Sequence, residues 1–149
     1  MSRSLSIIIL LLLSFAAGAE QKTIDQLKAE AEHASPDQQG RLYAEIADRL
    51  VAVADKQFTD GESVNGHATV QEILQYATKA HDLVIESRKK MKETEKSLRD
   101  CHRRLENMKR TLAAEDRPKV EAVEKQLEKL TEEVLESMFA PPDKKKDHK

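Results

Sequence analysis

Apolar side chains recur at alternating steps of three and four residues through the middle of the chain. This spacing places them on one face of a helix and is typical of a coiled-coil seam. Because neither proline nor glycine interrupts it, the pattern predicts one continuous helix over residues 64–114. The seam positions are Val70, Ile73, Ala77, Ala80, Val84, Ser87, Met91, Thr94, Leu98, Cys101, Leu105, Met108 and Leu112.

Even about 45 residues of this helix would span roughly 68 Å, which exceeds the diameter of a compact domain of this size. Part of the predicted helix should therefore project from the rest of the molecule. Ser87 and Thr94 are the two polar members of the seam and mark its weakest stretch. A kink between residues 87 and 94 is the main alternative to a straight helix.

Three further segments show the spacing of amphipathic helices. The first two begin like capping boxes, formed by Thr23 with Gln26 and by Ser35 with Gln38, and Asp116 can cap the third. The sequence therefore predicts an all-α protein, an antiparallel helical bundle with one long central helix. The predicted helices span residues 24–34, 36–59, 64–114 and 117–139.

Charge favours pairing of the last predicted helix with the second half of the long one. Residues 86–110 contain ten basic and five acidic side chains, whereas residues 115–136 contain four basic and eight acidic ones. The short connection between them is typical of an antiparallel hairpin. We therefore expect a C-terminal two-helix coiled-coil hairpin that projects as an arm from a three-helix body.

Folding these two helices together also predicts a register. It brings Lys109 near Glu124 and Arg104 near Glu133. Each exposed ion pair contributes only about 0–1 kcal/mol, so the apolar seam must supply most of the stability. The predicted seam of the hairpin consists of Leu98, Cys101, Leu105, Met108, Leu112, Val120, Val123, Leu127, Leu130 and Val134.

Composition agrees with a helical protein of one domain. The chain has 149 residues, 35% charged and 3% aromatic, with four glycines and four prolines, which excludes a β-sandwich or barrel. We expect one all-helical domain over residues 20–139 and a disordered basic tail over residues 140–149. In that tail, Lys144–Lys146 could make a weak contact with an anionic membrane surface. The net charge of −2 argues against a nucleic-acid partner.

The first residues have the features of a targeting segment. Arg3 precedes an apolar run that leads into Ala17-Gly18-Ala19, a small-x-small cleavage signal. The run is shorter than the roughly 20 apolar residues that a membrane span requires. The sequence therefore predicts a signal peptide over residues 1–19 and an exported protein, either periplasmic in a bacterium or secreted.

The reactive side chains form no recognised catalytic or metal-binding motif. Cys101 is the one cysteine, expected either as a buried thiol or in an intermolecular disulfide. Glu30 and His33 have the Glu-x-x-His spacing that di-iron bundles use twice, but no carboxylate stands three residues before His81 or His102. We therefore predict no enzyme, no catalytic, cofactor-binding or metal-binding residues, and no cofactor.

Two segments, Arg41–Phe58 and Val70–Glu86, resemble a degenerate tetratricopeptide-like helical hairpin. The residues that carry the resemblance are Tyr43, Ala47, Gly61, Tyr76, Ala77 and Ala80. Such repeats bind peptides or proteins in stacked arrays, so the resemblance implies a role in protein interaction. It identifies no binding residue.

Two functional hypotheses follow. The first is a structural or adaptor protein of the cell envelope, which binds a protein partner through the helical seam and could form a homodimer along the arm. The alternative is a periplasmic chaperone or stress-binding protein for unfolded clients, which an exposed apolar patch rimmed by charge would favour. Leu83, Ile85 and Leu135 lie off the main seam, where they either cover the first helix or remain exposed.

Overall fold

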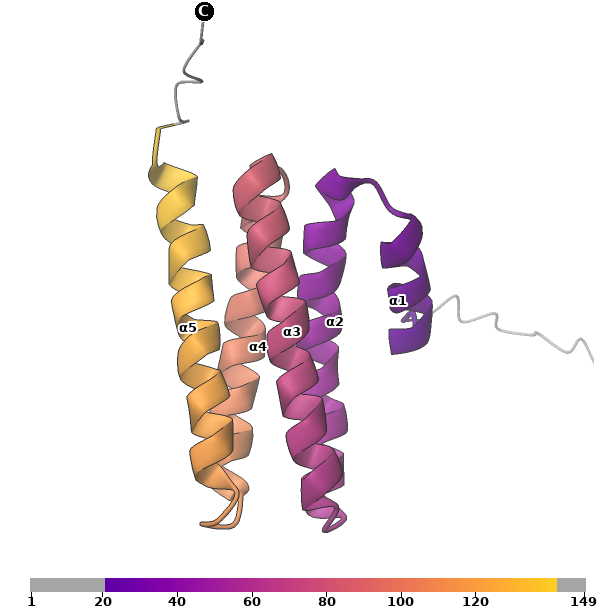
Figure 1. Cartoon of the computed structure of the whole chain (residues 1–149), viewed down its shortest axis with the longest axis vertical. Coiled ribbons are helices and arrows are strands. Elements are labelled where there is room, and N and C mark those ends of the chain that lie inside the picture. Colours follow the sequence, from indigo (N-terminus) through magenta and orange to yellow (C-terminus); the bar gives the residue numbers. More distant parts are fainter. Residues whose placement is uncertain (1–20, 142–149) are drawn as a thin grey trace, which may run out of the picture.

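The computed structural model describes residues 21–141, and this part of the chain is entirely helical apart from its turns (Figure 1). The prediction of an all-α protein is confirmed for these residues. The predicted signal peptide and the lysines of the basic tail lie outside them. The helices are α1 (Ile24–His33), α2 (Pro36–Thr59), α3 (Ser63–Ser87), α4 (Met91–Thr111) and α5 (Arg117–Phe139).

The prediction of one continuous helix over residues 64–114 is wrong. The chain leaves α3 after Ser87, reverses direction through a three-residue turn, and enters α4 at Met91. Arg88 and Lys90 in this turn both have a φ of 55°, in the left-handed region. The break falls in the stretch where a kink was the alternative, but it reverses the chain (Figure 1). Reversal lets the apolar face of α4 pack against α2 as well as α5, which a projecting arm could not do.

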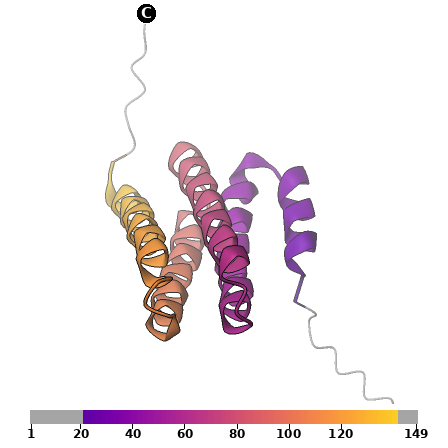
Figure 2. The same ribbon diagram turned by 60° about the horizontal axis from the view of Figure 1, so that its bottom comes forward.

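Helices α2 to α5 form a four-helix bundle built from two antiparallel hairpins, α2–α3 and α4–α5. Helix α2 packs against α3 and α4, and α5 packs against α3 and α4. The turn between α3 and α4 therefore crosses the bundle, so that α2 lies parallel to α4 and α3 lies parallel to α5 (Figures 1 and 2). The predicted projecting arm is thus wrong, because the second hairpin lies along the first.

One core runs through both hairpins. Leu42, Ile46 and Ile73 from the first hairpin, and Leu98 and Leu127 from the second, are fully buried in the same apolar cluster. Burial of such side chains stabilises the fold by about 1.5–3 kcal/mol each. Nine members of the predicted hairpin seam are buried, and Leu130 is partly buried against them. The seam is therefore core and is not accessible to a partner in this fold.

Helix α1 lies on the outside of α2 (Figure 2). Thr23 and Gln26 form the predicted capping box at its start. The second predicted capping box is absent, because the Ser35 side chain makes no capping hydrogen bond at the start of α2. Lys28 Nζ donates to Glu72 Oε1 at 2.6 Å, which ties α1 to α3 across the face of the first hairpin.

The close approach of the Phe58 ring to the α3 backbone explains why residue 66 is a glycine. A Cβ atom at Gly66 would lie 2.8–2.9 Å from atoms of the Phe58 ring. The ring therefore lies directly on the α3 backbone, and its edge-on neighbour is His67, with centroids 5.1 Å apart. This contact locks the α2–α3 turn end of the first hairpin.

Candidate functional site

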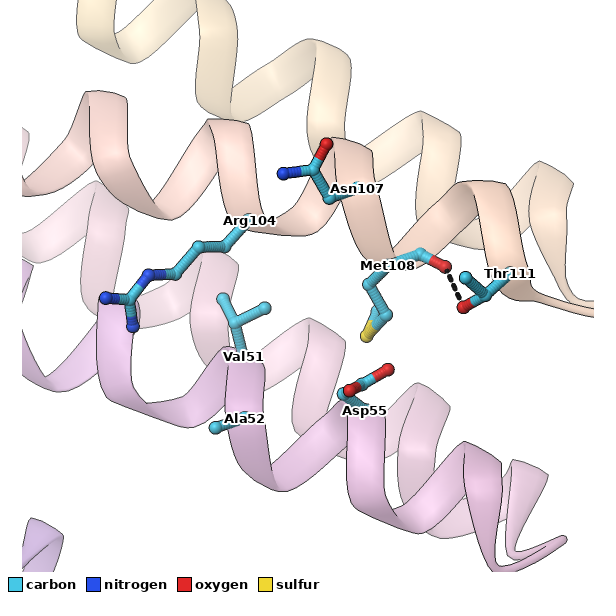
Figure 3. Close-up of a pocket in the computed structure, with 7 residues that line it drawn as sticks. All are labelled: Val51, Ala52, Asp55, Arg104, Asn107, Met108 and Thr111. Atoms are coloured by element: carbon cyan, nitrogen blue, oxygen red, sulfur yellow. Dashed lines mark hydrogen bonds between the residues drawn. The ribbon is translucent and has the colours of Figure 1, made fainter.

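An open groove of about 360 Å³ lies between the parallel helices α2 and α4, and Figure 3 shows its lining side chains. We name it the α2–α4 groove. Helix α2 contributes three residues of its last turns, and α4 contributes four residues along one side of the helix. The lining residues are Val51, Ala52, Asp55, Arg104, Asn107, Met108 and Thr111.

The groove has an apolar floor and a polar rim. Val51 and Met108 are buried at its base, while Asp55, Asn107 and Thr111 are exposed at its edges. The Thr111 hydroxyl donates to the Met108 carbonyl at 2.8 Å (Figure 3). Within residues 21–141 the structure shows no hydrogen bond to the Asp55 carboxylate or the Asn107 amide. Both side chains are exposed to solvent, and neither has a protein hydrogen-bond partner among the described residues.

A charged pair on α2 and α4 closes one end of the groove. Arg104 Nε lies 3.4 Å from Asp48 Oδ1, and this oxygen has no hydrogen-bond partner among the described residues. Burial raises the pKa of the Asp48 carboxyl above its usual range, and the positive charge of Arg104 partly opposes that rise. The pair connects the two hairpins through a half-buried contact.

Cys101 lies in the core near this pair. Its side chain is fully buried, and burial raises the pKa of the thiol well above its usual range, with a further contribution from the Asp48 carboxylate. A protonated, inaccessible thiol is a poor nucleophile and forms disulfides slowly. The structure therefore favours the buried-thiol interpretation of Cys101 over the intermolecular disulfide.

The two predicted ion pairs of the second hairpin have different outcomes. Lys109 Nζ donates to Glu124 Oε2, as the predicted register requires. The predicted pair between Arg104 and Glu133 is wrong. Arg104 points to Asp48 on α2, and Glu133 on α5 faces α3, because each helix of the hairpin also has a neighbour in the other hairpin.

Three histidines contact carboxylates at the two ends and the middle of α5. His67 Nε2 lies 2.8 Å from Asp116 Oδ1, and His102 Nε2 lies 3.3 Å from Glu124 Oε1. The third contact joins His81 Nε2 to Glu133 Oε2 at 2.8 Å. The expected capping role of Asp116 is absent, because its carboxylate instead binds His67 and accepts from the Ser63 hydroxyl at 3.1 Å. These contacts hold α5 against α3 and α4, and sequence spacing gave no signal for them.

The Glu-x-x-His pair of α1 lies apart from other ligand-type side chains in the described part of the chain. Glu30 of the Glu-x-x-His pair makes an ion pair with Lys22 at 2.5 Å. Residues 21–141 contain no group of three or more His, Cys, Asp or Glu side chains placed to hold a metal ion. The helices in the same range are also too short or too polar to cross a membrane.

The residues that carry the tetratricopeptide-like resemblance lie in the first hairpin. Tyr43 and Tyr76 face each other with ring centroids 5.7 Å apart, and Lys79 lies over both rings. Ala77 and the other two alanines are buried between the helices, and Gly61 occupies the α2–α3 turn with a φ of 80°. These side chains serve packing within the hairpin.

Large exposed apolar side chains are dispersed over the described surface. Val64 lies near the start of α3, whereas Leu135 and Phe139 lie near the end of α5, at the opposite end of the bundle (Figure 1). Leu83 and Ile85 are partly buried. This distribution gives less support to a broad surface for unfolded clients than to a local contact site.

Comparisons with models of protein families, with curated proteins and with solved structures find no match to this chain. The function is therefore inferred from the residues and contacts described above.

Proposed function

We propose that the chain is a non-enzymatic exported protein-interaction (adaptor) module of the cell envelope, and that it binds a protein partner through the α2–α4 groove. The observation that carries the proposal is an open groove with an apolar floor, whose rim holds exposed polar side chains without a protein hydrogen-bond partner among the described residues. Sites of this kind use the apolar contact for affinity and the few polar groups for orientation.

The groove suggests the chemistry of its partner. An apolar side chain of the partner would lie over the apolar part of the lining, which consists of the exposed Ala52 and the outer edges of Val51 and Met108. A basic or amide group beside it would meet Asp55, and an acidic group at the other end would meet Arg104. A short peptide segment with one apolar anchor between a base and an acid fits these requirements.

Export is supported by the sequence of residues 1–19, in which a basic start, an apolar run and a small-x-small signal follow one another. The tetratricopeptide-like resemblance of α2 and α3 adds support for a role in protein interaction. The predicted binding seam gives no support to an adaptor, since its residues form the core. The binding surface proposed here is therefore different from the one that the sequence suggested.

Two neighbouring residues of α2 allow a matched test. Ala52 is exposed and lines the groove, while Val53 is exposed and does not line it. An Ala52→Arg variant should block the groove without touching the core, and Val53→Arg introduces the same side chain one position further on. A photo-reactive amino acid at position 107 would cross-link a bound partner in an envelope fraction.

We expect the cross-linked species with the parent protein and with Val53→Arg, and its loss with Ala52→Arg. Equal cross-linking in both variants would contradict binding in the groove. Suppression of the aggregation of an unfolded client, equal in all three proteins, would instead support the chaperone alternative.

A further inference from the structure

The turn between α3 and α4 is strained. Arg88 and Lys90 both adopt a φ of 55°, a left-handed conformation that is unfavourable for any residue with a Cβ atom. The turn has the sequence Arg-Lys-Lys, without the glycine or asparagine that normally occupies such positions. Arginine and lysine are instead among the better helix formers. The local sequence therefore favours a helix at the point where the chain reverses.

The apolar pattern also continues through this turn without a change of step. Val84 and Ser87 precede it, and Met91, Thr94 and Leu98 follow it, still at alternating intervals of three and four. A helix that continued from α3 into α4 would keep all these residues on one face. Two conformations of the segment are thus compatible with its sequence, a reversal and a straight helix.

A straight segment would separate the two hairpins and expose their shared interface. Leu98 and Leu105 of α4 and Leu127 of α5 are fully buried in the bundle, so a lone chain could not leave them in water. A second copy of the chain offers an identical surface. We propose that residues 88–90 are a hinge, and that two copies exchange their α4–α5 hairpins to form a dimer in which α3 and α4 are continuous.

Contacts and exposed side chains at the hinge end of the bundle support a second copy of the chain as the partner. Arg88 donates to the carbonyl oxygens of Ser137 at 2.7 Å and Ala140 at 3.1 Å, which places the end of α5 beside the turn. Phe139 at this end is 80% exposed. In an exchanged dimer the two copies meet at their hinges, where both Phe139 rings can be covered. The exchange rebuilds the α2–α4 groove from two copies, with Val51 from one and Met108 from the other.

Two lysines of the turn give a matched pair of variants. Lys90→Gly has two effects: it removes a strained residue from the reversal, and it weakens a continuous helix. Lys89 does not have a positive φ, so Lys89→Gly only weakens the continuous helix. After refolding at high concentration, light scattering should show a dimer of the parent chain. We expect its dissociation constant to rise at least about 100-fold in Lys90→Gly and about tenfold in Lys89→Gly. A parent chain that stays monomeric would overturn the proposal, as would equal effects of the two variants.

A charge exchange distinguishes swapping from simple association. Asp48 on α2 and Arg104 on α4 belong to different hairpins. Asp48→Arg and Arg104→Asp each place like charges in contact within one chain and within its homodimer. In an exchanged heterodimer of the two variants, both contacts join opposite charges. Mixed and refolded together, the variants should form a heterodimer that melts above either variant alone; melting as the sum of the separate proteins would overturn the exchange. Neither experiment requires the proposed groove partner, so its outcome is independent of that proposal.

Discussion

At the residue scale, the contact between Phe58 and Gly66 should be sensitive to a single methyl group. Gly66→Ala places a Cβ atom 2.8–2.9 Å from the ring, so the ring must move. We expect a loss of about 1–3 kcal/mol in the free energy of unfolding, measured with urea. In Phe58→Leu, which has no ring at this position, the same alanine should cost much less. An equal cost in both backgrounds would show that the ring is not the cause.

Gly40 is a useful comparison for this prediction. A Cβ atom there would lie 3.3 Å from the Ala80 carbonyl oxygen, a tighter contact than usual but not an overlap. Alanine also favours the helix by about 1 kcal/mol over glycine. We expect the two effects to cancel to within about 1 kcal/mol, so Gly40→Ala should change the unfolding midpoint far less than Gly66→Ala.

The Asp48 carboxyl gives stability a pH dependence with a definite sign. Because burial raises its pKa in the folded protein, the folded state holds this proton to higher pH than the unfolded state does. The contribution of Asp48 to stability therefore falls as the pH rises from the unfolded pKa through the folded pKa. Relative to Asp48→Asn, the parent protein should lose stability in urea titrations as the pH rises above the usual aspartate pKa of about 4. A difference that grows in the opposite direction would contradict the burial argument.

Cys101 reports directly on opening of the core. Its thiol is buried and its pKa is raised, so a disulfide-forming reagent should react only when the bundle opens. We expect negligible labelling of the native protein over minutes and complete labelling in denaturant. Rapid native labelling at a rate proportional to reagent concentration would show that the thiol is accessible.

At the element scale, Glu124 joins α5 to α4 through two side chains of α4. It is 8% exposed and contacts both Lys109 and His102. Glu124→Lys would bury a positive charge beside these groups, and we expect a loss of about 3–5 kcal/mol. Glu128→Lys, one turn further on α5 and exposed, should change stability by less than about 0.5 kcal/mol in the same thermal melts. Similar losses from the two variants would contradict the assigned register.

The helix boundaries show which starts and ends of helices can be predicted from the sequence. The starts of α1 and α2 follow from their capping and proline positions, and the end of α2 follows from Gly61. The end of α3 has no such signal, because Arg88, Lys89 and Lys90 all favour a helix. Only packing of the second hairpin against the first, which depends on residues far away in the chain, decides that the chain reverses there.

At the scale of the whole molecule, the arrangement of the hairpins decides what is accessible. The apolar periodicity predicted most core residues of α4 and α5, since a seam is buried whichever neighbour covers it. It could not predict that α2 lies parallel to α4. The partner of Arg104 and the α2–α4 groove both depend on that placement. For this reason the fold class followed from the sequence, whereas the candidate site did not.

The reversal at residues 88–90 is the feature from which the bundle, the groove and the hinge all follow. It can be measured as one distance, between spin labels at Val64 and Ala113, both exposed, in a Cys101→Ala background and in dilute monomeric protein. In the bundle these positions lie at the same end, with Ser63 and Ala113 lining one hollow. We expect a distance below about 30 Å, whereas a continuous helix, at 1.5 Å per residue, would place them roughly 70 Å apart. A single population near the longer distance would contradict the fold described here.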